Sequence, residues 1–337
     1  MKKDTSQDNP LENVQSNIPE KLVFLSCSPI DLYFRWQYDV MLYNFRKFKL
    51  LDHVQIIVWY PKQRESEIKD WQYLIDKYPN VKIFFYEDSG VDLALYIPQL
   101  RPHSLKKHFE KYKDILQDRI FFYHDSDIIF NFLPNFDILC QGDINWQSDT
   151  SHYLDYNYLR RKEEEGNIPS EEAISVLCNI GNISIETMRA YSNKTGGAQY
   201  ILKGIDYNFW EDIERQVIEI RKKFTFNQPN SINSKYFESE NKGFQSWCAD
   251  MWAVNMALWN RDKITDITPE LDFSWATDSN ETYSKKPIYH NAGATGVEPG
   301  VFCKSKWINK SPIGLNHAVS KNSASWNYAQ IIMECKK

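Results

Sequence analysis

The stretch RIFFYHDSDIIF, residues 119–130, contains an apolar run that ends abruptly at two aspartates. An uninterrupted run such as residues 120–123 is typical of a strand that is buried on both faces. Similar runs lie upstream at residues 21–26, 53–60 and 81–88, and helical patterns separate them. This alternation predicts an α/β fold with a mostly parallel central sheet flanked by helices.

The clearest predicted helix follows the first of these strands. Aromatic and apolar residues recur at spacings of three and four between Phe34 and Phe48, which lays an apolar stripe along one helix face. Asp31 is the predicted N-cap of this helix. Further helices are expected near residues 65–78 and 104–117, so each predicted strand is followed by a helical segment.

The length of 337 residues fits one large domain or two ordinary ones. No repeat or low-complexity linker divides the chain. We therefore expect a single domain over residues 21–320, with insertions at about 145–175 and 225–245. A polar arm (1–20) is expected before it and a tail (321–337) after it.

Composition excludes several classes of protein. The net charge of −5 provides no basic surface for nucleic acid, and no apolar run is long enough to span a membrane. The first twenty residues lack the apolar core of a secretory signal, and six scattered cysteines fit reduced thiols, so a cytoplasmic protein is expected. Aromatic residues make up 15% of the chain, which suits stacking on flat rings or sugar faces, or ordinary core packing.

Asp125 and Asp127 are the strongest candidates for functional residues. In open α/β sheets, ligands bind at the carboxyl ends of the strands, which is where these two side chains emerge. Two carboxylates one residue apart can share a divalent cation such as Mn²⁺ or Mg²⁺. The alternative is a turn in which both aspartates cap backbone groups. The position directly after an aromatic strand favours the metal site.

A second candidate ligand, His290, ends the short apolar segment 287–289 and opens a glycine-containing loop. Two aspartates and one histidine leave positions on an ion for two phosphate oxygens, whereas the alternative is a structural histidine. Lys304 and Lys306 follow in a short loop and can neutralise a diphosphate. A metal, two phosphates and an aromatic-rich cleft indicate nucleotide-sugar chemistry, in which negative charge develops on the departing diphosphate.

Two further segments resemble a known family. Residues 33–37 (YFRWQ) and 40–48 (VMLYNFRKF) resemble the Y-x-x-W-Q … M-x-Y-x-x-K-K-F segment of the hydroxyproline O-arabinosyltransferase and peptidyl-serine α-galactosyltransferase group. Residues 245–252 (QSWCADMW) resemble the W-x-x-E/D-M-Y/W helix of that group. With the D-x-D strand end and the late histidine, the chain resembles the GT-A fold glycosyltransferases in patches over roughly residues 21–310.

The resemblance implies a metal-dependent hexosyl- or pentosyltransferase. It would move a sugar from a UDP-sugar to a hydroxyl group of a protein, glycan or small molecule, with retention of anomeric configuration. The resemblance assigns metal binding to Asp125, Asp127 and His290. It places the nucleotide at the end of the first strand, beside Ser26, Cys27 and Ser28.

Asp250 falls in the first turn of a predicted helix whose apolar stripe comprises Trp247, Met251, Val254 and Leu258. It is a candidate catalytic residue that binds a sugar hydroxyl or takes the proton of the acceptor. The alternative is an acidic residue that merely interacts favourably with the helix dipole.

Four more positions are candidates for the sugar and diphosphate sites. Gly196 and Gly197 form the densest glycine site in a glycine-poor chain and allow a ligand to approach the backbone closely, although a tight turn is the alternative. Gln199 follows as a second candidate catalytic residue, able both to donate and to accept. Arg101 either contacts the diphosphate or pairs with a surface acid.

The leading hypothesis is thus a metal-dependent glycosyltransferase. A non-catalytic protein that binds nucleotide sugars or carbohydrates on the same fold is the alternative, since it explains the aromatic content equally well. A metal-dependent phosphohydrolase would need more clustered carboxylates or histidines than this sequence offers.

Overall fold

The computed structural model describes residues 18–89, 96–165, 169–236, 243–294, 296 and 298–336. Residues 1–17 of the predicted arm, and parts of both predicted insertions, lie outside the described residues. Within the described part, no helix is both long enough and apolar enough to cross a membrane.

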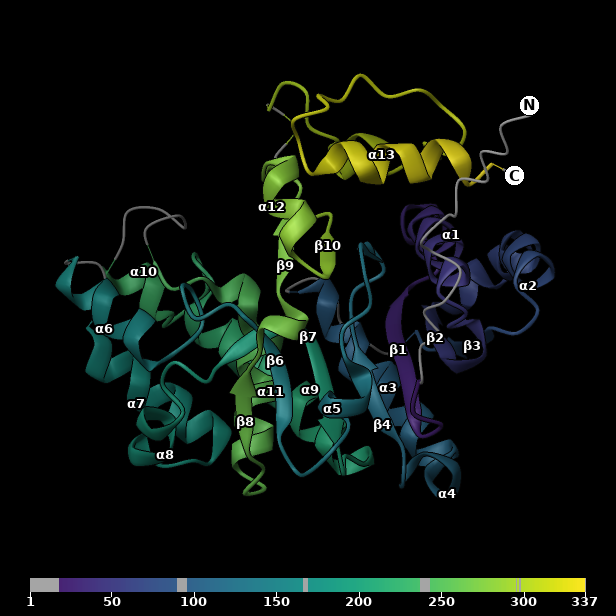
Figure 1. Ribbon diagram of the computed structural model, residues 1–337. Coiled ribbons are helices and arrows are strands. Elements are labelled where there is room, and N and C mark those ends of the chain that lie inside the picture. The colour runs from purple at the N-terminus through teal and green to yellow at the C-terminus, as the bar shows by residue number, and fades with distance from the viewer. Residues whose placement is uncertain are drawn as a thin grey trace, which may run out of the picture.

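A seven-stranded sheet forms the centre of the molecule, in the order β3-β2-β1-β4-β7-β6-β8 (Figure 1). Its strands are β1 (Leu22–Pro29), β2 (Val54–Tyr60), β3 (Lys82–Glu87), β4 (Ile120–Tyr123), β6 (Asn145–Asp149), β7 (Gly196–Lys203) and β8 (Thr265–Ile267). The first four run parallel to one another, β7 is antiparallel to β4 and β6, and β8 is parallel to β6. The predicted α/β fold with a mostly parallel sheet is confirmed.

Helices cover both faces of this sheet. The helices of the described residues are α1 (Leu32–Lys47), α2 (Gln72–Lys77), α3 (Leu100–Lys111), α4 (Lys113–Leu116), α5 (Phe136–Leu139), α6 (Tyr156–Glu164), α7 (Ser170–Gly181), α8 (Ile185–Ala190), α9 (Tyr207–Phe224), α10 (Ile232–Tyr236), α11 (Ala249–Trp259), α12 (Asn280–Lys285) and α13 (Ser325–Glu334). One buried cluster joins the sheet to α3, α7, α9 and α11, and another joins its opposite face to α1, α2 and α5.

A small second sheet, absent from the sequence-based prediction, lies beside the first. It pairs β5 (Ile128–Phe130) with β10 (Ile288–His290) in antiparallel fashion, and β10 with β9 (Phe273–Trp275) in parallel. A third buried cluster packs Tyr289 of β10 and Trp36 of α1 against Tyr328 of α13. Helix α13, which falls within the predicted tail, lies next to α1 across one end of the molecule (Figure 1).

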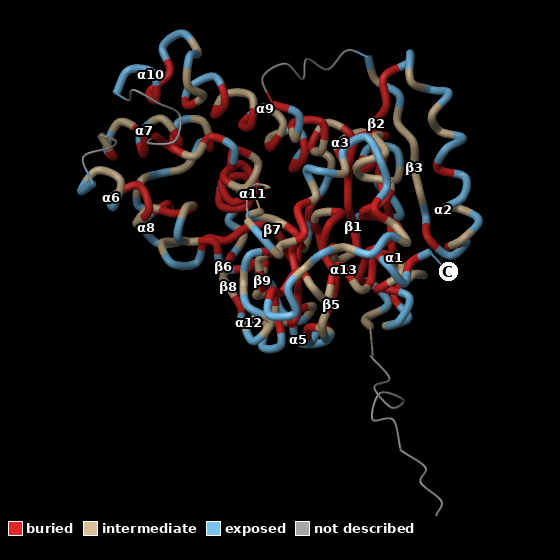
Figure 2. The backbone as a smooth tube through the Cα atoms, turned by 90° about the horizontal axis from the view of Figure 1, so that it is seen from above, coloured by how far each residue is buried: buried red, intermediate tan, exposed pale blue. Residues whose placement is uncertain are grey.

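The prediction of an apolar stripe on α11 was wrong. Nine of its eleven residues are buried, and Figure 2 shows this helix as buried in the interior. Because α7, α9 and β7 pack around it, α11 is apolar nearly all round, and no stripe is needed. Trp247 lies just before it, in the 3₁₀ turn Ser246–Cys248, and is 51% exposed.

Two other local predictions needed correction. Asp31 occupies the N-cap position of α1, but its carboxylate makes no capping hydrogen bond and instead pairs with Arg64 at 2.7 Å. The helical segments expected near 65–78 and 104–117 each divide in two: a 3₁₀ stretch, Lys62–Trp71, followed by α2, and α3 followed by α4. All six cysteines are free thiols, as expected.

A charged cluster ties α3 to α9 and predicts a pH-dependent stability. His103 Nε2 lies 2.8 Å from Asp88 and Nδ1 lies 2.6 Å from Glu214, while Lys106 and Lys107 pair with the same two carboxylates. Burial acts to lower the pKa of His103, but the two carboxylates outweigh it and raise this pKa above its usual value.

Since the folded-state pKa of His103 lies above the unfolded value of about 6.5, its stabilising effect is complete below that pH and is lost as the pH rises through the folded value. We expect the urea midpoint of His103→Gln to fall further below that of the wild type at pH 6 than at pH 9. An equal gap at both pH values would contradict this account of the cluster.

Candidate functional site

The segment between β4 and β5 carries the two predicted aspartates and is fixed from both sides. His124 donates from Nδ1 to the Asp125 carbonyl at 2.8 Å. Ser126 donates to the side-chain oxygen of Gln37 on α1 at 2.9 Å. Asp125 is half-buried and Asp127 is fully buried. These contacts therefore fix the position of the segment that carries the two carboxylates.

Strand β10 brings the predicted histidine to the same place. His290 is in register with Ile128, and the Asn291 amide donates to the Asp127 carbonyl at 3.0 Å. His290 Nε2 lies 3.3 Å from Asp125 Oδ2 and 3.3 Å from Asp127 Oδ1. One ligand atom from each of the three residues falls within 4.8 Å of the others.

This donor set fits a divalent cation. Neighbouring ligands of an octahedral ion with bonds of about 2.1 Å lie about 3 Å apart, which is close to the separations between His290 and the two carboxylates. Carboxylate oxygens with one imidazole nitrogen suit Mn²⁺ well and Mg²⁺ acceptably. The three residues Asp125, Asp127 and His290 therefore form a group able to hold such an ion.

Two cationic side chains flank the carboxylates. Arg101 lies 2.7 Å from Asp125 Oδ1, and Lys304 pairs with Asp127. Burial disfavours the charged form of each aspartate, but the facing Arg101 and Lys304 outweigh it and hold the pKa of both carboxyls below its usual range. Both aspartates are therefore ionised at neutral pH, as metal binding requires.

The charges of the two aspartates also change the pKa of His290. Burial acts to lower its pKa, but Asp127 and Asp125 outweigh burial and raise the pKa to about 9. Only neutral imidazole coordinates a metal, so an ion must displace the proton from Nε2. Metal binding at this group should consequently strengthen as the pH rises toward 9.

Gln199 on β7 lies behind His290, away from solvent. It is fully buried; one end of its amide lies 3.3 Å from His290 Nδ1 and the other lies 2.7 Å from Ser148 Oγ. Ser148 Oγ also lies 2.7 Å from the Leu271 carbonyl, and its single hydrogen serves only one acceptor. In the structure, Gln199 Nε2 faces His290 and Gln199 Oε1 faces Ser148. With the amide turned over and the imidazole neutral, all groups are satisfied: Ser148 donates to Leu271, the Gln199 nitrogen donates to Ser148, and the Gln199 oxygen accepts from His290 Nδ1. The lone pair on His290 Nε2 then faces the two aspartates.

This arrangement makes Gln199 a support for a metal ligand, and it leads to a prediction. Loss of a partner that orients a metal-bound histidine typically weakens metal affinity by about 10–100-fold. We expect Gln199→Leu to raise the Kd for Mn²⁺ by that factor, as measured by electron paramagnetic resonance titration of the ion.

Gln216→Leu is the matched control, because Gln216 is equally buried on α9 and its amide has no hydrogen-bond partner among the described residues. Its Mn²⁺ affinity should equal that of the wild type. Equal affinities for the wild type and Gln199→Leu would mean that Gln199 does not orient His290.

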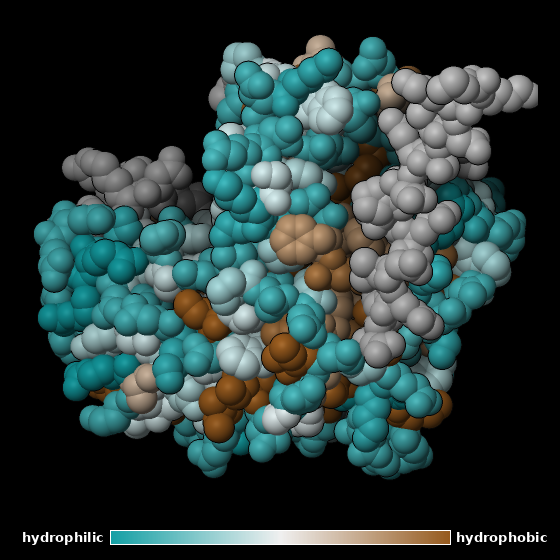
Figure 3. Space-filling model, viewed as in Figure 1, coloured by the Kyte–Doolittle hydropathy of each residue, from teal (hydrophilic) through white to brown (hydrophobic). Residues whose placement is uncertain are grey.

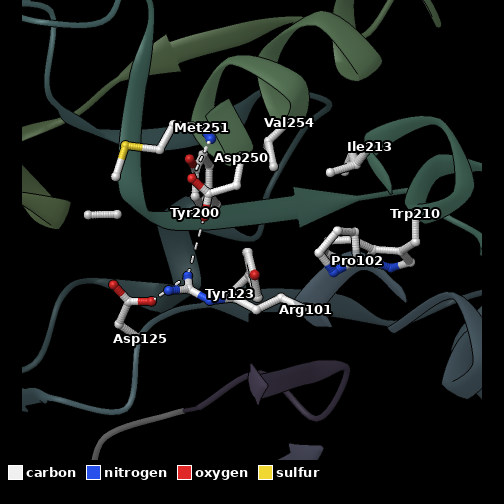
Figure 4. A pocket seen from close by; sticks show the side chains of 11 residues that line it. Arg101, Pro102, Tyr123, Asp125, Tyr200, Trp210, Ile213, Asp250, Met251 and Val254 are labelled. Atoms are coloured by element: carbon white, nitrogen blue, oxygen red, sulfur yellow. Dashed lines mark hydrogen bonds and ion pairs between the residues drawn. The ribbon is translucent and has the colours of Figure 1, made fainter. Parts of the chain in front are cut away.

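A cavity of about 570 Å³ opens beside this group. Its lining comprises Tyr96, Pro98, Arg101, Asp125, Tyr153, Ala198, Gln245, Trp247, Asp250, Met251, Trp275, His290, Ala292, Gly293 and Lys304. A smaller cavity of about 20 Å³ adjoins it; in Figure 4, Arg101 lies between Asp125 and Asp250 at its edge. Arg101 therefore pairs with acids of the site and not with a surface acid.

Asp250, at the start of α11, lies in the wall of this cavity. Its Oδ1 accepts from Tyr96 Oη at 3.0 Å and from the Met251 amide at 3.1 Å, and its Oδ2 lies 3.5 Å from Arg101. The contact with Met251 matches the predicted alternative of an acid at a helix N-terminus, while the other contacts face the cavity. Burial raises the pKa of Asp250, which makes its carboxylate a stronger hydrogen-bond acceptor.

The paired glycines do not form the tight turn that was the alternative interpretation, because they begin strand β7. A Cβ at Gly196 would lie 2.0 Å from the Ser148 carbonyl, and one at Gly197 would lie 2.7 Å from Met251 Sδ. The next residue, Ala198, has φ +68° and lines the cavity, an uncommon conformation for alanine. Glycine at both positions lets β7 approach β6 and α11 closely.

Four residues predicted to contact the nucleotide do not line this cavity, and their contact with a nucleotide stays a prediction. Ser26, Cys27 and Ser28 are buried in β1, and Ser26 Oγ lies 3.1 Å from Tyr38 Oη. Lys306 is exposed, unlike Lys304. The described residues that line the 570 Å³ cavity include none of these four.

Sequence reasoning missed several residues of the cavity wall, namely Tyr96, Tyr153, Gln245 and Trp275. The three aromatic residues belong to no motif, and only the aromatic content of the chain hinted at them, whereas Gln245 begins the quoted segment 245–252 but was given no role. Trp247 was noticed but was assigned to helix packing, whereas it stands at the cavity and pairs with Tyr153 at a ring distance of 5.5 Å.

Comparison with known proteins supports the fold. No family model matches the sequence, and no curated protein matches it either. Among solved structures, the apo form of the bifunctional glycosyltransferase WbbM aligns with a TM-score of 0.50 at 11% identity, over 94% of this chain and 51% of that chain. The chain thus spans about half the length of WbbM.

Two further solved structures align less well. Apo mouse xyloside xylosyltransferase 1 gives a TM-score of 0.39 at 11% identity, over 82% of this chain and 100% of that one. A mannosyltransferase from Pyrobaculum calidifontis, in complex with GDP-Man and Mn²⁺, gives 0.25 at 10% identity, over 71% and 73%. Neither carries an inference about this chain. The sheet order and the likeness to WbbM identify the fold class as GT-A, as the sequence resemblance implied.

Proposed function

We propose that this protein is a metal-dependent glycosyltransferase that moves a sugar from a UDP-sugar to a hydroxyl acceptor. The observation that carries the proposal is the group of Asp125, Asp127 and His290, whose ligand atoms lie within 4.8 Å of one another at the carboxyl end of β4. This is the edge of an α/β sheet at which ligands bind. A cavity large enough for a small-molecule substrate adjoins it.

The two segments that resemble the hydroxyproline O-arabinosyltransferase and peptidyl-serine α-galactosyltransferase group support this proposal, because both reach the site. Gln37, in the first segment, holds Ser126 between the two aspartates. Asp250, in the second, lines the cavity. The choice of UDP as the nucleotide rests on this resemblance.

The proposed roles of the site residues follow from the charges and ligand atoms of their side chains. Asp125, Asp127 and His290 hold Mn²⁺ or Mg²⁺, which when bound neutralises negative charge on the diphosphate. Lys304 donates to the departing diphosphate, and Arg101 adds positive charge on the other side of Asp125. The bond between the anomeric carbon and the phosphate oxygen breaks, and its electron pair stays on that oxygen.

We propose retention of anomeric configuration. The acceptor oxygen bonds to the anomeric carbon on the face that the diphosphate leaves, and the acceptor proton passes to the departing phosphate oxygen. Asp250, already held by Tyr96 and Arg101, then binds a sugar hydroxyl and need not act as a base. An inverting reaction would instead need Asp250 as the base. Nuclear magnetic resonance assignment of the anomeric configuration of the product decides between the two courses.

The first experiment is calorimetric titration of UDP into the protein with Mn²⁺ and then with EDTA. Micromolar binding that needs the metal supports the proposal, and release of UDP from a UDP-sugar in the presence of acceptor completes it. Absence of binding in both conditions overturns the UDP-sugar function. Metal-dependent UDP binding without transfer from any UDP-sugar favours the non-catalytic binding protein.

A further inference from the structure

The contacts along the wall of the 570 Å³ cavity give it two chemically different ends. At one end, Asp125 and His290 lie together, with Lys304 beside them. From there, Arg101 links Asp125 to Asp250, and Tyr96 links Asp250 to the Trp247 backbone at 2.7 Å. Asp250 thus connects the charged end to the far end, which contains Trp247.

The far end is aromatic and carries one buried side-chain oxygen that lacks a hydrogen-bond partner. Trp247 is 51% exposed, and its ring lies 5.5 Å from that of Tyr153, with a tilt of 36°. The side-chain oxygen of the neighbouring Gln245 is buried in the described structure without a hydrogen-bond partner. A buried acceptor that lacks a partner is costly, so this oxygen points to a hydroxyl or amide donor from a ligand.

The charged end is the place for a diphosphate, so the donor sugar falls near Asp250 and the acceptor must approach from the aromatic end. An exposed indole offers a flat apolar face, whereas Gln245 and Asp250 offer acceptors in the wall of the same cavity. A pyranose ring is complementary to both features: it has a face of C–H groups that can stack on the indole and a rim of hydroxyl groups that can donate to the acceptors.

We propose that the acceptor is a carbohydrate whose pyranose ring stacks on Trp247, with hydroxyl groups donating to Gln245 and Asp250. This inference rests on the proposed function and narrows its acceptor to one class. In the transfer, a hydroxyl oxygen of this ring forms the new bond to the anomeric carbon, the bond to the diphosphate breaks, and the hydroxyl proton leaves on the diphosphate.

The test is saturation-transfer nuclear magnetic resonance with the full chain, diamagnetic Mg²⁺ and UDP. The probes are the methyl α- and β-pyranosides of glucose, galactose, mannose and xylose, and serine- and hydroxyproline-containing peptides. We expect at least one glycoside to bind, with transfer concentrated on the protons of one ring face. Trp247→Ala should weaken that binding by about tenfold, and Trp247→Phe should weaken it less.

Trp326→Ala is the matched control, since Trp326 is half-buried on α13 and does not line the cavity. It should bind the glycoside as the wild type does. The Kd for UDP with Mn²⁺ should be the same in all variants, so loss of UDP binding by the wild type marks failure of the proposed function instead. The carbohydrate proposal is overturned if no glycoside binds, if Trp247→Ala binds one equally well, or if only peptides bind.

Discussion

Asp127→Asn is expected to lower kcat/KM by on the order of 10³ or more and to abolish measurable Mn²⁺ binding. Asp127 is buried, contacts both His290 and Lys304, and supplies one of the two carboxylates of the group. The amide is nearly the same size but carries no charge, so it cannot neutralise an ion in this buried place. A metal that stabilises a departing diphosphate contributes several kcal/mol, and about 4 kcal/mol corresponds to 10³ in rate.

The measurement pairs Mn²⁺ titration by electron paramagnetic resonance with steady-state kinetics, and a melting curve verifies that the variant is folded. Asp118→Asn makes the same chemical change at an exposed position before β4, and should match the wild type in both readouts. Asp125→Ala should behave as Asp127→Asn does. Full metal-dependent activity in either site variant would remove this group from the metal assignment.

Lys304→Met is expected to separate metal binding from turnover. Lys304 pairs with Asp127, so its ammonium group repels a cation that binds the same carboxylate. Removing the ammonium should leave Mn²⁺ affinity at least as high as in the wild type. Turnover should nevertheless fall by about 10²–10³, because a positioned donor to the charge that develops in the transition state contributes on that scale.

Lys306→Met provides the control and also tests the second lysine that the sequence singled out. Lys306 lies only two residues further along, yet it is exposed and does not line the cavity. We expect its kcat to stay within about threefold of the wild type, as for most surface changes. A Lys304→Met variant that loses Mn²⁺ binding along with turnover would show that Lys304 supports the metal group itself.

Those parts of the fold that depend on local chemistry were predictable. Strands β1, β2 and β4 begin and end within a few residues of the apolar runs. A short apolar run that is stopped by polar residues is typical of a strand buried on both faces. The two aspartates were found for the same reason, since the end of such a strand is where they stand. Most of the face in Figure 3 is hydrophilic, with hydrophobic patches across its middle and lower part.

The remaining parts of the fold and of the candidate site depend on contacts between segments that are distant in the sequence. His290 reaches the aspartates only because β10 pairs with β5, some 160 residues away, and the spacing of either segment gives no sign of this. The misread stripe of α11 has a similar cause: its apolar spacing is real, but neighbours on several sides, and not one face, account for it. Gln199 was singled out for its donor and acceptor groups, but its place behind His290 follows from the three-dimensional arrangement alone.

The position of β10 in the chain sets how much of the polypeptide must be synthesised before Asp125, Asp127 and His290 can come together. All seven strands of the large sheet lie within residues 22–267, whereas His290 and Lys304 follow later in the chain. A nascent chain that has left the ribosome up to residue 267 has the carboxylates but lacks the imidazole and the ammonium. The group of Asp125, Asp127 and His290 is therefore complete only after the segment with β10 has emerged and paired with β5.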